Sequence, residues 1–128
     1  MPNEKNELTE EQRELTENYL KSYGFCYRLM AMKNYEDKYF DTMVWEPESP
    51  AKFTLARAKM YEVRHFILDM PNSDEKLLLF YHYVRMTPVE RCAELLGISR
   101  SSAFRLKKKA LQRAYYHSLA TGKELKAF

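Results

Sequence analysis

The sequence predicts an all-α protein in which a helical N-terminal arm precedes a small bundle of helices. Two observations support this class. The 128 residues include only three glycines and five prolines, so long stretches lack the residues that interrupt helices. Apolar residues make up 45% of the chain and recur at the three- and four-residue spacing of a helix face. The length fits one domain, or one domain with an arm.

The first predicted helix covers residues 8 to about 43. Thr9 and Gln12 have the spacing of a capping box, in which each side chain accepts a hydrogen bond from the other residue's backbone amide. We expect Gly24 to bend or interrupt this helix. A stripe without charged residues predicts the buried face, with the tyrosine hydroxyls at its half-buried edge. Its members are Leu8, Leu15, Tyr19, Tyr23, Tyr27 and Met30.

Residues 45–50 (WEPESP) form the clearest break in the chain. Two prolines three positions apart are disfavoured inside a helix, and each pushes the residue before it to an extended conformation. We therefore expect a linker between an N-terminal arm, residues 1–50, and a globular part, residues 51–128. Trp45 either belongs to this linker or anchors it on the core.

Two further helices are expected before residue 88. The first covers residues 53–69, with a regular apolar stripe at Phe53, Ala56, Met60, Val63 and Ile67. Asn72 or Ser73 then caps the next helix. The predicted buried face of that helix consists of Leu77, Phe80, Tyr81 and Val84. Residues 86–88 form a second break, where Thr87 is the expected N-cap and Pro88 the first residue of the following helix.

Residues 88–114 (PVERCAELLGISRSSAFRLKKKALQRA) carry the most informative pattern. A short helix over 88–96 ends at Gly97, where a tight turn requires a left-handed backbone. Ser99 caps a second helix at about 99–114, and Ile98 packs into the angle between the two helices. The expected inward side chains are Cys92, Ala93, Leu96, Ile98, Ala103, Leu106 and Ala110. This spacing is typical of a helix-turn-helix, and two ordinary core helices joined by a glycine turn are the alternative.

Charge is distributed unevenly and points to the second helix of this motif. Residues 1–50 hold six basic and eleven acidic residues, and residues 51–128 hold fifteen and seven, which together give the 21 and 18 of the whole chain. A helix fits the DNA major groove with its N-terminal residues at the base edges. The predicted base contacts are Arg100, Ser101, Ser102, Phe104 and Arg105. The predicted phosphate contacts are Ser99, Lys107, Lys108, Lys109 and Arg113. A solubilising surface is the alternative.

Patterns for catalysis, cofactors and metals are missing from the sequence. There is no glycine-rich phosphate loop and no nucleophile elbow. Cys26 and Cys92 lack partners at metal-ligand spacing, so we expect two reduced, buried thiols. We interpret His65 and Asp69 as a surface hydrogen bond, not a metal pair. No apolar run approaches the roughly 18–20 residues that cross a bilayer, and we expect a cytoplasmic protein that is not an enzyme.

The segment LLGISRSSAFRLKKKAL resembles the region-4 helix-turn-helix of sigma-70 factors. It matches that family's leucine-glycine-(Val/Ile)-Ser-Arg pattern, followed by a recognition helix that ends in Lys-x-Ala-Leu. Residues 81–87 (YHYVRMT) are similar to the family's preceding helix. The arrangement also resembles the phage-encoded ArpU and RinA type of transcriptional regulators in Gram-positive bacteria. The resemblance covers about residues 54–116 and is strongest in 88–111. Ala103 departs from the valine or isoleucine usual in the family.

The resemblance implies promoter or operator binding in a bacterial host, by a protein that a phage or mobile element encodes. A full sigma factor is not expected, because its core-binding and −10-reading regions have no counterpart here. A single helix-turn-helix makes few contacts, so we expect a homodimer joined through residues 8–43. The acidic face of this arm could instead shield the basic helix or contact RNA polymerase. Two other functions stay open: a DNA-packaging component such as a small terminase-like subunit, and a protein-interaction module such as an anti-activator.

Overall fold

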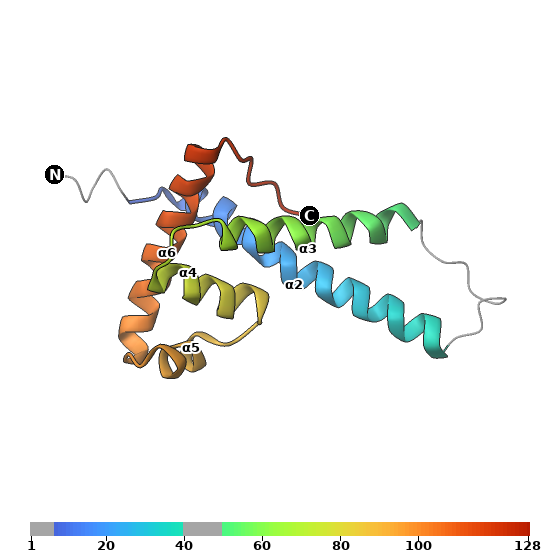
Figure 1. The fold of residues 1–128 in the computed structure, drawn as a ribbon, viewed down its shortest axis with the longest axis horizontal. Coiled ribbons are helices and arrows are strands. Elements are labelled where there is room, and N and C mark those ends of the chain that lie inside the picture. The colour runs from blue at the N-terminus through green and yellow to red at the C-terminus, as the bar shows by residue number, and fades with distance from the viewer. Residues whose placement is uncertain (1–6, 40–49) are drawn as a thin grey trace.

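The computed structural model describes residues 7–39 and 50–128, and within these ranges it confirms the all-α class. The described part contains five α-helices, one π-helix and no strand. They are α2 (Glu10–Tyr39), α3 (Pro50–Leu68), α4 (Asp74–Leu79), the π-helix η1 (Phe80–Val84), α5 (Val89–Leu96) and α6 (Arg100–Thr121). In Figure 1, α2 and α3 form a long antiparallel pair, and α6 crosses the end of this pair where α2 begins. Helices α4 and α5 pack against α6 below this crossing.

Helix α2 begins with the predicted capping box. The Thr9 backbone amide donates to Gln12 Oε1 at 3.0 Å, and the Gln12 amide donates to Thr9 Oγ1 at 3.1 Å. The Gln12 side-chain amide also donates to the Tyr115 hydroxyl at 3.1 Å, which joins the start of α2 to α6. The helix continues through Gly24, so the expected interruption there is wrong. The predicted helix end near residue 43 lies outside the described residues.

The predicted linker largely lies outside the described residues, because Trp45 and the residues up to 49 are not described. Pro50 is the first residue of α3, a position where its missing amide hydrogen removes no helical hydrogen bond. Residues on both sides of this region share one core, to which α2 contributes Tyr19 and Leu20. The other buried members of this core include Val63, Ile67, Leu78, Leu79, Tyr83, Cys92, Ala110, Leu111, Ala114 and Leu125. The division into two domains at residue 50 stays a prediction.

The buried face of α2 differs in part from the predicted stripe. Tyr19 is fully buried, but Leu15 and Tyr27 are 48% and 47% exposed. Thr16 and Ser22 are buried in their place. Their hydroxyls donate to the backbone carbonyls of Gln12 at 2.8 Å and Asn18 at 3.1 Å, respectively. A serine or threonine whose hydroxyl donates to a carbonyl of its own helix can be buried at little cost in free energy. The buried face of α2 therefore cannot be predicted from apolar residues alone.

Helix α3 confirms the predicted stripe, since its five members are buried or half-buried. Ser73 caps α4 as predicted, with the Lys76 amide donating to its hydroxyl at 3.2 Å. The next buried face is partly wrong: Leu77 is 45% exposed, whereas Leu78 and Leu79 are fully buried. The run from 77 to 84 is apolar around nearly the whole helix, so periodicity could not select the face that packs against α6. Val84 is buried as predicted.

The break at residues 86–88 forms one position away from the prediction. The N-cap of α5 is Pro88, and Thr87 caps nothing with its side chain. Met86 has a left-handed backbone with φ 54°, and the Thr87 amide donates to the Tyr81 carbonyl at 2.9 Å. This hydrogen bond commits Thr87 to the end of η1, so the first helical residue becomes Val89. None of the helices in the described ranges is both long and apolar enough to span a membrane.

Candidate nucleic-acid interface

The turn between α5 and α6 is set by Gly97, as predicted. Gly97 has a left-handed backbone with φ 69° and ψ 34°. Its amide donates to the Glu94 carbonyl at 3.2 Å, and the Ile98 amide donates to the Ala93 carbonyl at 3.0 Å. These two bonds form a Schellman motif, which satisfies carbonyls at the end of α5. No atom lies within 4 Å of where a β-carbon on Gly97 would be, so the backbone conformation, not lack of space, favours glycine.

Ser99 begins the second helix of the motif, which confirms the predicted cap. Its backbone is extended, and its hydroxyl accepts a hydrogen bond from the Ser102 amide at 3.1 Å. Between the two helices, Val89, Ala93 and Ala103 form a small buried cluster against which Ile98 packs. Every member of the predicted inward set is buried or half-buried. The local geometry is therefore a helix-turn-helix whose first and second helices are α5 and α6.

The side chains predicted to contact bases lie around the first two turns of α6. Arg100, Phe104 and Arg105 are exposed, as is Ser101, while Ser102 is half-buried. Arg100 lies 3.4 Å from Glu90 Oε2 and 5.7 Å from the centre of the Phe104 ring. Arg105 Nη2 donates to the Ser102 hydroxyl at 3.1 Å. These contacts hold both arginines at the surface, where each keeps most of its donors available.

The side chains predicted to contact phosphates divide into two groups. Lys108, Lys109 and Arg113 are exposed on the outer side of α6, although Arg113 Nε also lies 3.7 Å from Glu75 Oε1. Lys107 is different, because it is only 24% exposed and its Nζ lies 3.0 Å from Glu17 Oε2 on α2. The hydroxyl of Ser99 is occupied by the cap. Of the five side chains predicted to contact phosphates, the structure thus brings three, Lys108, Lys109 and Arg113, to one outer face.

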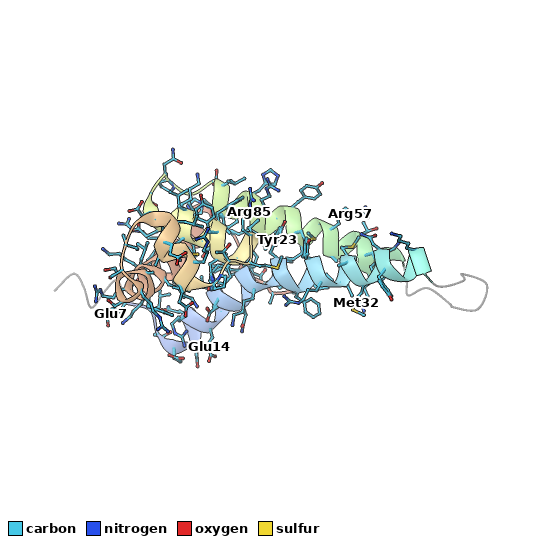
Figure 2. The ribbon with its side chains drawn as sticks, turned by 90° about the horizontal axis from the view of Figure 1, so that it is seen from below. Glu7, Glu14, Tyr23, Met32, Arg57 and Arg85 are labelled. Atoms are coloured by element: carbon cyan, nitrogen blue, oxygen red, sulfur yellow. The ribbon has the colours of Figure 1, made fainter. Side chains whose placement is uncertain are left out.

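A shallow groove follows this outer face of α6. Its lining residues are Glu7, Ser102, Arg105, Leu106, Lys108, Lys109, Gln112, Arg113 and Tyr116. Figure 2 shows Glu7 and Glu14 at the end of the molecule that holds α6, whereas Met32 and Arg57 lie toward the far end of the α2–α3 pair. One acidic residue, Glu7, therefore lies in the cationic groove, just before α2 begins.

Glu17 is a central residue of this region that the sequence did not single out. Its carboxylate accepts from the Tyr83 hydroxyl at 2.8 Å and pairs with Lys107. Burial would raise the pKa of Glu17, but the hydrogen bonds from Tyr83 and Lys107 outweigh burial, and the net pKa lies below the usual range. The ionised carboxylate therefore holds α6 against α2 and η1. The sequence held no local signal for this role, because Tyr83 and Lys107 are far from Glu17 in the chain.

The cysteines and histidines considered for metal or redox chemistry are buried, paired or stacked on other side chains. Cys26 and Cys92 are free and buried, as predicted, and burial raises the pKa of both thiols. The predicted pairing of His65 with Asp69 is wrong, because Asp69 Oδ2 lies 3.2 Å from His117 Nε2 instead. His65 stacks on the ring of Tyr61. The described residues contain no group of three or more side chains placed to bind a metal ion.

No family model matches the chain, and no curated protein or solved structure matches it either.

Proposed function

We propose that this chain is a sequence-specific duplex-DNA-binding transcriptional regulator that uses α6 as its recognition helix. The observation that carries the proposal is the exposed cationic face of α6, held at a fixed angle to α5 by the Gly97 turn and the Ser99 cap. The major groove admits one α-helix, and the first turns of that helix reach the base edges. Arg100 and Arg105 occupy those turns with exposed guanidinium groups.

The contacts divide by chemistry. Arg105 and Arg100 have the forked donors that recognise guanine, and Ser101, Ser102 and Phe104 complete the proposed base-contacting set. Lys108, Lys109 and Arg113 follow along α6 and suit phosphates, for which charge matters more than geometry. A phosphate contact by Lys107 would require breaking its ion pair with Glu17, so we propose that Lys107 positions α6. DNA then approaches the groove from the side away from α2.

The proposal also includes a dimeric state, a contact with RNA polymerase and a phage or mobile-element origin. A single helix-turn-helix makes few base contacts, so two copies on two half-sites would supply the affinity of a typical regulator. The acidic residues just before and at the start of α2, Glu7 and Glu14 among them, are a candidate contact for RNA polymerase. The resemblance of residues 88–111 to region 4 of sigma-70 factors favours a regulator that a phage or mobile element encodes and that acts in the bacterial cytoplasm.

The test compares two variants of the full chain on a duplex selected from a random pool and on a scrambled duplex, at several salt concentrations. Arg105→Ala should lower affinity for the selected duplex by about tenfold or more, since a good arginine–guanine pair contributes about 1–3 kcal/mol, with little effect on the scrambled one. Lys108→Ala should weaken both duplexes alike and reduce the salt slope by about one.

The control is Arg57→Ala, which removes an exposed arginine far from α6 and should leave both affinities unchanged. Equal losses on both duplexes for Arg105→Ala would remove sequence-specific readout from the proposal. If the wild-type chain binds no duplex even at low salt, DNA binding itself is excluded and the protein-interaction module becomes the better interpretation. A ring of many copies in solution would favour the packaging component.

A further inference from the structure

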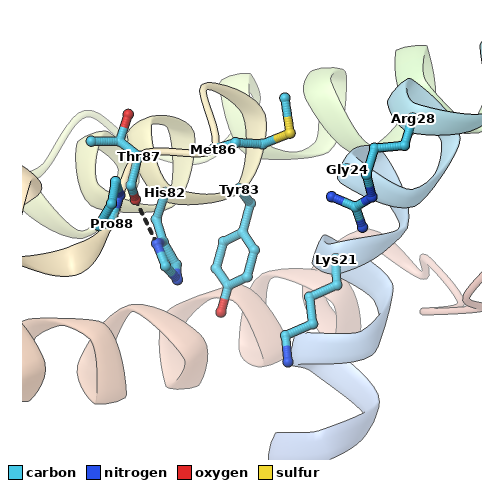
Figure 3. Close-up of a pocket in the computed structure, with 8 residues that line it drawn as sticks. All are labelled: Lys21, Gly24, Arg28, His82, Tyr83, Met86, Thr87 and Pro88. Atoms are coloured by element: carbon cyan, nitrogen blue, oxygen red, sulfur yellow. Dashed lines mark hydrogen bonds between the residues drawn. The ribbon is translucent and has the colours of Figure 1, made fainter. Parts of the chain in front are cut away.

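A second cavity lies on the other side of the helix-turn-helix, where α2 passes η1 and the turn before α5. Its volume is about 340 Å³. Figure 3 shows Lys21 and Arg28 extending from α2 on one side, and His82, Tyr83 and Met86 on the other. Gly24, Thr87 and Pro88 are the other lining residues. This volume is near the lower end of small-molecule sites, which span about 300–1,000 Å³.

A glycine within a helix and two departures from regular backbone geometry meet at this cavity. Gly24 lies in the middle of α2, where glycine is a poor helix former. Residues 80–84 form a π-helix, a conformation that is rare and often found at functional sites. Met86 has a left-handed backbone, which is unfavourable for a residue with a side chain. Residues from all three features line the same cavity.

Gly24 lines the cavity on the α2 side. A β-carbon at this position would lie 3.4 Å from Arg28 Nη1 and 3.6 Å from Met86 Sδ, which are ordinary van der Waals contacts. A methyl group would therefore fit here, whereas a longer side chain would extend toward Arg28 and Met86. This part of the cavity combines a forked cation with an apolar, polarizable sulfur atom.

The charge of the cavity is positive. Lys21 and Arg28 supply two cations, and no Asp or Glu is among the residues that line the cavity. Glu17, which acts on His82, is bound by Tyr83 and Lys107. His82 Nδ1 lies 2.8 Å from the Thr87 carbonyl oxygen and donates to it, which fixes the ring at the cavity wall. Besides Glu17, the charged groups that act on His82 are Lys107 and Lys21, and both are positive.

We propose that this cavity binds a small free anion that carries a carboxylate or phosphate group. The Arg28 guanidinium matches the two oxygens of such a group, and the Lys21 ammonium adds a second charge. The apolar part of the ligand lies against Met86 and Tyr83. Because Pro88 lines the cavity and is also the N-cap of α5, occupancy would reach the helix-turn-helix directly. Only this last effect rests on the proposed DNA-binding function; ligand binding does not.

The test is an NMR titration of the full chain, without DNA, using inorganic phosphate and citrate at constant ionic strength. We expect saturable shifts of the Gly24 and Thr87 amides and of the His82 ring with at least one of the two anions. Arg28→Gln should weaken binding by about tenfold or more, because a charge-assisted hydrogen-bonded pair is lost. Arg57→Gln, which removes an exposed arginine on α3 outside the cavity, is the matched control and should leave binding unchanged.

A second variant tests the proposal by filling part of the cavity with a larger side chain. Gly24→Leu directs a side chain toward Arg28 and Met86 and should abolish the saturable shifts while α2 remains helical by circular dichroism. Shifts that rise linearly with both anions, or that are the same in all variants, would overturn the proposal. If Arg28→Gln instead weakens duplex binding and lowers the salt slope by about one, the cavity contacts a DNA phosphate and the free-anion assignment is wrong.

Discussion

Gly97→Ala tests whether the turn of the helix-turn-helix is fixed by backbone conformation. Gly97 has φ 69°, and a residue with a β-carbon is disfavoured there by about 1–2 kcal/mol. The added methyl group meets no atom within 4 Å, so no steric term is added. Alanine also restricts the unfolded chain, which offsets about 0.4–1 kcal/mol of the loss. The net destabilisation should be about 1 kcal/mol, or about 4 °C in melting temperature.

Urea unfolding, followed by circular dichroism, measures this difference. Gly97→Asn should recover most of the loss, because asparagine tolerates the left-handed region. Gly122→Ala is a matched comparison, since Gly122 has φ 68°, ends α6 and also has no atom within 4 Å of an added β-carbon. It should lose a similar free energy of unfolding. If Gly97→Ala is as stable as wild type, or Gly97→Asn is as unstable as Gly97→Ala, the conformational argument fails.

Two further predictions concern buried polar groups. Glu17→Gln should lower the free energy of unfolding by about 1–2 kcal/mol at pH 7, because the charge that pairs with Lys107 is lost. In a double-mutant cycle with Lys107→Met, the two losses of stability should be coupled and not additive. Burial lowers the pKa of His82 despite its bond to Thr87, so the unfolded chain binds a proton first and stability should fall as pH drops below about 6.5. His82→Gln should flatten the profile of urea midpoint against pH in that range, whereas the exposed-site control His65→Gln should not; an unchanged slope in His82→Gln would contradict this assignment.

The ends of several helices were predictable because their chemistry is local. Thr9 and Gln12 cap α2, Ser73 caps α4, and Gly97 and Ser99 frame the turn of the motif. Each of these signals depends on hydrogen bonds between groups that lie within five positions of each other in the chain. The sequence contains all the information needed to satisfy such hydrogen bonds. Where a neighbouring turn competed for the same backbone groups, at residues 86–88, the predicted cap was displaced by one position.

The buried faces were predictable only where one side of a helix is clearly apolar. Helix α3 has such a side, and its stripe was correct. The segment containing Leu77 and Leu79 is apolar all around, so contact with α6 decided which leucines were buried. In α2, Thr16 is buried because its hydroxyl bonds within the helix, a possibility that residue type alone does not reveal.

The sequence by itself determined the helical class, the turn at Gly97 and the cationic character of α6, because propensity, capping and charge are properties of short segments. Only the tertiary structure decided that Lys107 faces Glu17 and not the outer groove, and that Arg28 and His82 meet across one cavity. These residues are far apart in the chain, and their partners depend on how α2 crosses η1 and α6. The angle of that crossing is fixed by side-chain packing in the core, which no local pattern encodes.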